Sequence, residues 1–146
     1  MHHYTNCGLR NVWLRNGYEA RKTLYGKAVA IHDLEGLHRA IAGTLIASRP
    51  KLSGAEFRFL RKELELSQAS LAKLFGNDAQ SVALWEKRSK VPTWADRLLR
   101  GLYRATIEGN VPLRRMIEEL NALEGSPSRR LTFEDTGKGW APRLAA

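Results

Sequence analysis

The sequence is poor in the residues that cross-link small proteins, because Cys7 is its only cysteine. A single cysteine excludes an internal disulfide and a multi-cysteine metal site. The chain also lacks any apolar run near the ~20 residues that a membrane-spanning helix needs. Its first residues are polar histidines with no apolar signal core after them, so we expect a cytoplasmic protein without a membrane partner.

Enzyme motifs are missing as well. The chain has no glycine-rich phosphate loop, no G-x-S-x-G elbow and no paired carboxylates of the catalytic kind, so we expect that it is not an enzyme. No C-x-x-C, H-x-x-x-H or H-E-x-x-H spacing links the residues that could still bind zinc, namely His2, His3, Cys7, His32 and His38. We therefore expect no metal and no cofactor.

What the sequence does have is positive charge. It holds 24 Lys and Arg against 15 Asp and Glu, a formal charge of +9 over 146 residues. This balance favours a polyanionic partner, either nucleic acid or an anionic membrane, although many basic proteins bind neither. The length suits one ordinary domain or two small ones.

Residues 1–50 are expected to form a small β-rich module. Asn16-Gly17 is a strong hairpin turn signal, Tyr25-Gly26 is a second turn, and His2-His3 reads as a solvated end. These turns predict a three-stranded meander over residues 11–14, 18–24 and 27–31. The covered face of this sheet would hold Val12, Leu14, Val29 and Ile31.

A helix over residues 33–48 should cover that sheet, since a sheet of this size is marginal alone. Asp33 is its expected N-cap, and its apolar stripe recurs at helical spacing in Leu34, Leu37, Ile41 and Leu45. Arg49-Pro50-Lys51 then breaks the pattern and predicts a domain boundary.

Residues 51–124 predict a bundle of five helices. Ser53 and Glu56 form a capping box that starts the first helix. A second capping box is expected at Thr93–Asp96, opening a helix that ends at Gly109, and the last amphipathic helix is expected over 112–124. Residues 125–146 form a polar tail with a weak hairpin around Leu131–Trp140.

The second and third helices of this bundle are short and lie in the stretch Leu66–Arg88. Ser67 is expected to cap the first of them, Gly76 to end it in a left-handed conformation, and Asp78 to cap the other. The second helix directs Val82 and Trp85 inward, and its outward residues are Ala79, Gln80, Ser81, Ala83, Leu84, Lys87 and Arg88. Small or amide side chains at the start of a helix and cations at its end suit the DNA major groove.

This stretch resembles the helix-turn-helix of the XRE-type (lambda-repressor-like) DNA-binding family, over Leu52–Tyr103. The matching motifs are S-Q-x-x-L-A from Ser67, the turn at Gly76, Q-S-V from Gln80 and W-E-x from Trp85. The family usually has glycine where this chain has Arg88. The resemblance implies that Arg61 in the preceding helix pairs with Glu86, an ion pair we expect to be structural.

Gln80 is the best candidate base reader, because a glutamine amide can bond to N7 and N6 of adenine together. Ser81 could contact a base or a phosphate, Ala79 lies beside them, and Leu84 could meet a thymine methyl or serve domain packing. Phosphate contacts are expected from Gln68, Lys73, Lys87, Arg88 and Lys90, with a solvated surface charge as the alternative for each cation.

The order of a β-rich module, a helix and an XRE-type domain is similar to that of MqsA/HigA-type antitoxins. Tyr4–Gly8 lies where the zinc-ribbon branch has its first cysteine pair, and the pair is incomplete. We thus expect an α+β, mainly α, transcriptional regulator that binds a palindromic operator in double-stranded DNA as a homodimer. Repression is the default, and an antitoxin that represses its own operon is the sharper version. The alternative is a protein-interaction module for a cognate toxin, bound by residues 1–50 or by Phe133 and Trp140.

Overall fold

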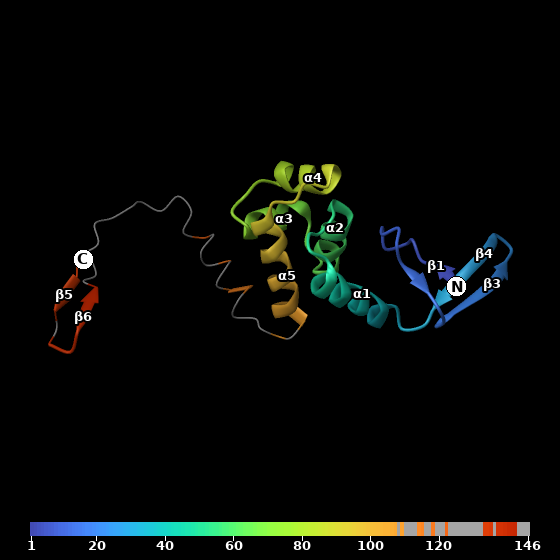
Figure 1. Cartoon of the computed structure of the whole chain (residues 1–146), viewed down its shortest axis with the longest axis horizontal. Coiled ribbons are helices and arrows are strands. Elements are labelled where there is room, and N and C mark those ends of the chain that lie inside the picture. The colour runs from blue at the N-terminus through green and yellow to red at the C-terminus, as the bar shows by residue number, and fades with distance from the viewer. Residues whose placement is uncertain are drawn as a thin grey trace.

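A computed structural model of the chain describes residues 1–107, 109, 114, 115, 118, 122, 133–135 and 137–142. The protein is α+β and mainly helical (Figure 1). Its strands are β1 (His2–His3), β2 (Trp13–Leu14), β3 (Tyr18–Thr23), β4 (Gly26–Ile31), β5 (Phe133–Asp135) and β6 (Trp140–Pro142). Its helices are α1 (Leu34–Ser48), α2 (Gly54–Glu63), α3 (Gln68–Leu74), α4 (Ala79–Arg88) and α5 (Thr93–Ile107). Across the described ranges, none of the helices has the length and apolar character needed to cross a bilayer.

The three-stranded meander predicted for the N-terminal residues is wrong. Strand β1 pairs with β2, and β3 pairs with β4, giving two separate antiparallel ladders. The turn at Asn16-Gly17 therefore joins two sheets and makes no hairpin. His2-His3 forms β1, where His3 is exposed as expected and its ring stacks on the exposed Trp13 with centroids 4.1 Å apart.

The β3–β4 hairpin has its turn at Leu24-Tyr25, close to the prediction, but its expected covered face is only partly covered. Leu14 is buried and Ile31 packs against the core, whereas Val29 is 38% exposed. The reason is visible in Figure 1, where the hairpin extends away from the helices and only its base approaches them.

Helices α1 to α4 begin where the sequence predicts. Helix α1 starts at its cap Asp33, whose carboxylate accepts a hydrogen bond from the Gly36 amide. Both halves of the capping box are present at the start of α2, between Ser53 and Glu56. One continuous core joins the helices to the N-terminal segment, and its buried members include Tyr4, Leu9, Leu14, Ile41, Leu45, Phe57, Leu60, Leu71, Val82, Leu99 and Leu102.

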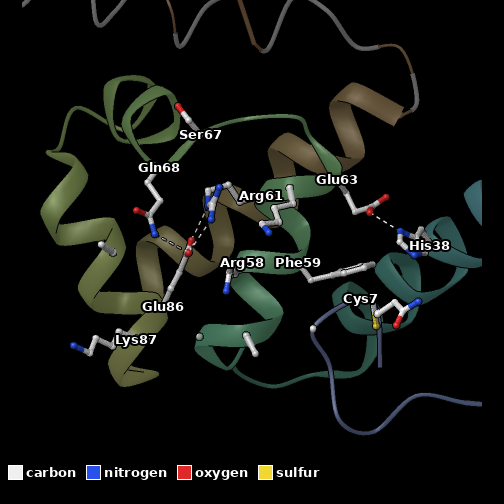
Figure 2. A pocket seen from close by; sticks show the side chains of 16 residues that line it. Cys7, His38, Arg58, Phe59, Arg61, Glu63, Ser67, Gln68, Glu86 and Lys87 are labelled. Carbon is white, nitrogen blue, oxygen red and sulfur yellow. Dashed lines mark hydrogen bonds and ion pairs between the residues drawn. The ribbon is translucent and has the colours of Figure 1, made fainter. Parts of the chain in front are cut away.

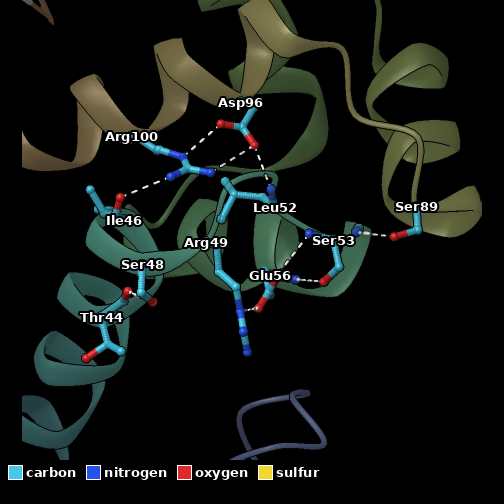
Figure 3. A network of polar contacts seen from close by, with 11 residues as sticks. Thr44, Ile46, Ser48, Arg49, Leu52, Ser53, Glu56, Ser89, Asp96 and Arg100 are labelled. Atoms are coloured by element: carbon cyan, nitrogen blue, oxygen red, sulfur yellow. Dashed lines mark hydrogen bonds and ion pairs between the residues drawn. The ribbon is translucent and has the colours of Figure 1, made fainter.

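The capping box predicted at Thr93–Asp96 is wrong. Thr93 is already helical, and the Asp96 carboxylate turns into the protein, where it accepts from the Leu52 amide at 2.7 Å (Figure 3). The Arg100 guanidinium lies 2.7 Å from the same carboxylate and donates to the Ile46 carbonyl at 3.0 Å. A buried carboxylate needs such partners, because an unpaired buried charge is costly. Asp96 therefore ties both sides of the predicted boundary at residues 49–51 to α5.

This network sets the charge of Asp96. Burial alone would raise the pKa of its carboxyl group, but the Leu52 amide, Arg100 and Arg97 outweigh burial and lower the pKa below its ordinary value of 3.8. The carboxylate is thus charged at neutral pH.

The tail hairpin is present, because β5 and β6 pair in antiparallel fashion with Asp135 opposite Trp140. Its predicted beginning at Leu131 lies outside the described residues. The predicted helix over 112–124 also falls mostly outside them.

Candidate functional site

Helices α3 and α4 are short and are joined by a turn whose geometry is set by three residues. The Ser67 hydroxyl accepts from the Ser70 amide at 3.0 Å and starts α3. Gly76 has φ +66°, a left-handed conformation that glycine adopts without strain. Asp78 then caps α4 by accepting from the Ser81 amide at 2.8 Å. Local sequence alone therefore fixes where both helices begin and where the chain turns.

An ion pair holds α4 against α2. The Arg61 guanidinium donates to both carboxylate oxygens of Glu86, at 2.7 and 2.9 Å, and to the Leu66 carbonyl at 2.9 Å (Figure 2). The side chains of Arg61 and Glu86 are only 7% and 5% exposed. Gln68 at the start of α3 donates to the same carboxylate at 3.1 Å. The predicted pair is confirmed, and it links three helices.

Aromatic rings fix the other side of α4. Trp85 meets Phe57 edge-on at 6.1 Å between ring centroids, and it meets Trp94 at 5.6 Å. Trp94 in turn meets Phe75 at 5.9 Å. Edge-to-face pairs at these separations are favourable beyond the area they bury. Trp85 was predicted to be a core residue, and it is partly buried and packs against the core among aromatic rings from α2 and α5.

The end of α4 lies very close to the start of α2. A Cβ atom on Gly54 would lie 2.1 Å from the Glu86 carbonyl oxygen, so only glycine fits at this crossing. Where the XRE family usually has glycine, Arg88 continues the helix and Ser89 takes the left-handed conformation with φ +53°. The Ser89 hydroxyl accepts from the Gly54 amide at 2.8 Å, which helps to hold this conformation.

The opposite side of α4 is open. Gln80, Lys87 and Arg88 are exposed, and Leu84 is 44% exposed. Ala79 and Ser81 are half-buried beside them, and Lys90 is exposed just beyond the end of the helix. The four predicted base-reading residues, Gln80, Ser81, Ala79 and Leu84, therefore share one short helix.

A cleft of about 850 Å³ adjoins this helix, between α2, α4 and the N-terminal segment. Figure 2 shows Gln68, Arg58 and Lys87 around it. Glu86 is paired with Arg61 and Glu63 is hydrogen-bonded to His38, and exposed cations outnumber these two carboxylates at the opening. Those cations are Arg58, Lys62 and Lys87.

Arg58 and Lys62 were missing from the predicted site. They are four residues apart in α2, with Arg61 between them, and residues at this spacing share a helix face. The buried Arg61, paired with Glu86, thus lies on the same stretch of α2 as two further cations.

Of the predicted phosphate ligands, Gln68 and Lys87 line the cleft, whereas Lys73, Arg88 and Lys90 do not. Lys73 lies on α3 beside Ser70, Leu74, Glu118 and Ala122. Gln68 does line the cleft, but its amide nitrogen donates to Glu86.

His38 bridges the N-terminal segment to α2 at the far end of the cleft. Its Nε2 lies 2.7 Å from the Tyr4 hydroxyl, and its Nδ1 lies 2.7 Å from Glu63. Burial raises the pKa of the Tyr4 phenol, and the neighbouring Cys7 and Glu63 add to the rise. Within the part of the chain that the structure describes, no three His, Cys, Asp or Glu side chains come together as a metal site would require.

The site is thus a helix held on its inner side by an ion pair and aromatic rings, with an open polar outer side and a basic cleft. This arrangement offers amide and hydroxyl groups for hydrogen bonding and cations for an anionic backbone. Comparisons with protein-family models, with curated proteins and with solved structures give no match.

Proposed function

We propose that the chain is a sequence-specific DNA-binding regulator of transcription, in which α3 and α4 act as a helix-turn-helix and α4 enters the major groove. The observation that carries this proposal is the two-sided character of α4. Its inner side is fixed by Arg61, Glu86 and Trp85, while its outer side leaves Gln80 and Leu84 exposed. A recognition helix needs both a rigid mounting and a free face.

Gln80 reads a base in this proposal. It lies in the first turn of α4, and the N-terminal residues of a recognition helix are the ones that contact base edges. Ser81 and Ala79 flank it with small side chains that let the helix approach the bases closely. Leu84 lies one turn further along and would contact a thymine methyl.

The cations around α4 hold the DNA backbone. Lys87, Arg88 and Lys90 follow the base-reading residues, and Arg58 and Lys62 line the cleft beside α4 together with Lys87. Each neutralised phosphate contributes ~0.9 to the slope of log affinity against log salt. Binding should therefore weaken steeply as salt rises.

The regulator acts as a homodimer on a palindromic operator, which places two α4 helices one DNA turn, ~34 Å, apart. Occupying a promoter in this way represses it. An antitoxin that represses its own operon is the sharper form of the same proposal, supported by the resemblance of the layout.

The test is binding of the full chain to duplexes that it selects from a random-sequence pool, measured across a salt series. We expect Gln80→Ala to relax the base preference at one position by ~1–3 kcal/mol and to leave the salt slope unchanged. We expect Lys87→Ala to weaken all sequences alike and to reduce the salt slope by about 1.

Glu65→Ala is a control for folding and for surface charge, since Glu65 is exposed between α2 and α3. If the Gln80 and Lys87 variants change preference and salt slope identically, the assigned roles are wrong. If the wild-type chain selects no sequence, the proposed function fails.

A further inference from the structure

The β3–β4 hairpin stands clear of the rest of the protein. Every residue from Glu19 to Ala30 is exposed, and only Tyr18 and Ile31 at the base pack against the core. A two-stranded hairpin is at best marginally stable alone in water. An element with both faces and both edges uncovered therefore offers a surface for a partner.

The tip of the hairpin has a distinctive composition. Residues 21–27, R-K-T-L-Y-G-K, contain three cations and no acidic side chain. At the turn, Leu24 is 99% exposed and Tyr25 is 100% exposed. Two apolar side chains at a protruding tip, with cations on both strands behind them, suit a partner that has an anionic backbone and an apolar interior.

The pairing register adds a second observation. Lys22 lies directly opposite Lys27, so two like charges face each other across the strands, which destabilises the free hairpin. Arg21 pairs with Glu19 at 3.0 Å, but both side chains are 71% exposed. Exposed ion pairs of this kind contribute little, so the guanidinium can turn to another anion. A polyanion would relieve the lysine repulsion.

We propose that the hairpin tip inserts into the minor groove of DNA beside the segment that α4 contacts. Leu24 and Tyr25 would wedge at a base step, as apolar side chains of minor-groove proteins do, while Lys22 and Lys27 hold the flanking phosphates. A protein partner fits less well. A protein interface would bury Lys22 and Lys27 away from water, whereas DNA offers each of them a phosphate. This inference rests on the proposed function, and it gives the DNA a second point of contact.

The reach of the hairpin is limited by its length. Each strand has six residues, which span ~20 Å or about six base pairs. Figure 1 shows the hairpin on the far side of α1 from α5, displaced sideways from α4. Its contact should therefore fall on base pairs that flank those under α4.

The experiment compares hydroxyl-radical footprints of the full chain and its variants on a duplex that the wild type has selected, with and without its flanks. We expect the wild type to protect the flanks, and Leu24→Ala/Tyr25→Ala and Lys22→Ala/Lys27→Ala to lose only that protection. On the long duplex the lysine variant should lose about 1.8 from the salt slope, for two phosphates. On the trimmed duplex both variants should bind as the wild type does.

A matched control removes two exposed cations elsewhere, Arg39→Ala/Arg104→Ala on α1 and α5, and should keep the flank protection. Flank protection that persists in both hairpin variants overturns the inference and leaves the role of α4 standing. The inference is also overturned if a hairpin variant loses a co-purifying protein while its footprint on DNA is unchanged. A wild-type chain that binds no duplex overturns both proposals.

Discussion

At the residue scale, the site depends on Arg61 and Glu86, because their charges are held where water barely reaches them. A buried ion pair often contributes little net stability, since desolvation of the two ions offsets their attraction. Removing one partner is a different matter, because the other charge is then buried alone. The pair therefore specifies how α2 and α4 dock more than it stabilises the fold.

We predict that Glu86→Ala lowers the free energy of unfolding by about 3–5 kcal/mol, since Arg61 loses its carboxylate partner. The double variant Arg61→Met/Glu86→Leu should recover most of that loss. Urea unfolding followed by helical circular dichroism measures both. A loss below about 1 kcal/mol in Glu86→Ala, the range of exposed pairs, would contradict the burial of the pair.

At the element scale, the sequence predicted helices better than strands. Helix starts could be predicted because a capping side chain accepts a hydrogen bond from an amide three residues further on, as at Ser53, Ser67 and Asp78. Strand pairing could not be predicted, because no residue next to Trp13 indicates that its partner strand is β1. The prediction that Asp96 belongs to a capping box was wrong for the same reason, since its partner Leu52 lies 44 residues away in the sequence.

The predicted site divides in a similar way. Gln80, Ser81 and Lys87 were predicted to share one helix, and the structure places all three on α4. Arg58 and Lys62 were missed because their place in the site depends on how α2 packs against α4. Contacts between elements require the fold, and local pattern carries no signal for them.

The crossing of α2 and α4 yields a prediction at this scale. Gly54→Ala would press a methyl group against the Glu86 carbonyl, and we expect a loss of about 1–3 kcal/mol in unfolding free energy. Gly43→Ala is the matched control within α1, where a Cβ meets nothing within 4 Å. That change should stabilise the protein by roughly 0.5–1 kcal/mol, because alanine favours a helix interior. Thermal unfolding of both variants decides the matter, and equal shifts would contradict the close approach.

At the scale of the whole molecule, Asp96 makes the free energy of unfolding depend on pH in the acidic range. Its pKa in the folded protein lies below 3.8, so its contribution is complete above the unfolded pKa and is lost as pH falls through the folded pKa. We predict that Asp96→Asn lowers stability at pH 7 by on the order of 3 kcal/mol, since Arg100 loses a buried partner. Below the unfolded pKa, the variant should lose less further stability than the wild type.

Urea unfolding at a series of pH values from 7 to about 2.5, a range that spans the ordinary carboxyl pKa, measures this difference. Asp78→Asn is a suitable comparison, because Asp78 is an exposed N-cap and asparagine caps nearly as well. If the free energy of unfolding falls equally with pH in the wild type and in Asp96→Asn, another carboxylate governs acid unfolding.

The bridge from Tyr4 through His38 to Glu63 means that the amino-terminal segment is a wall of the basic cleft as well as a neighbour of it. Asn6, Cys7 and Gly8 line the same space as Arg58 and Lys87. Whatever pulled this segment aside would reshape the surface next to α4 without touching α4 itself.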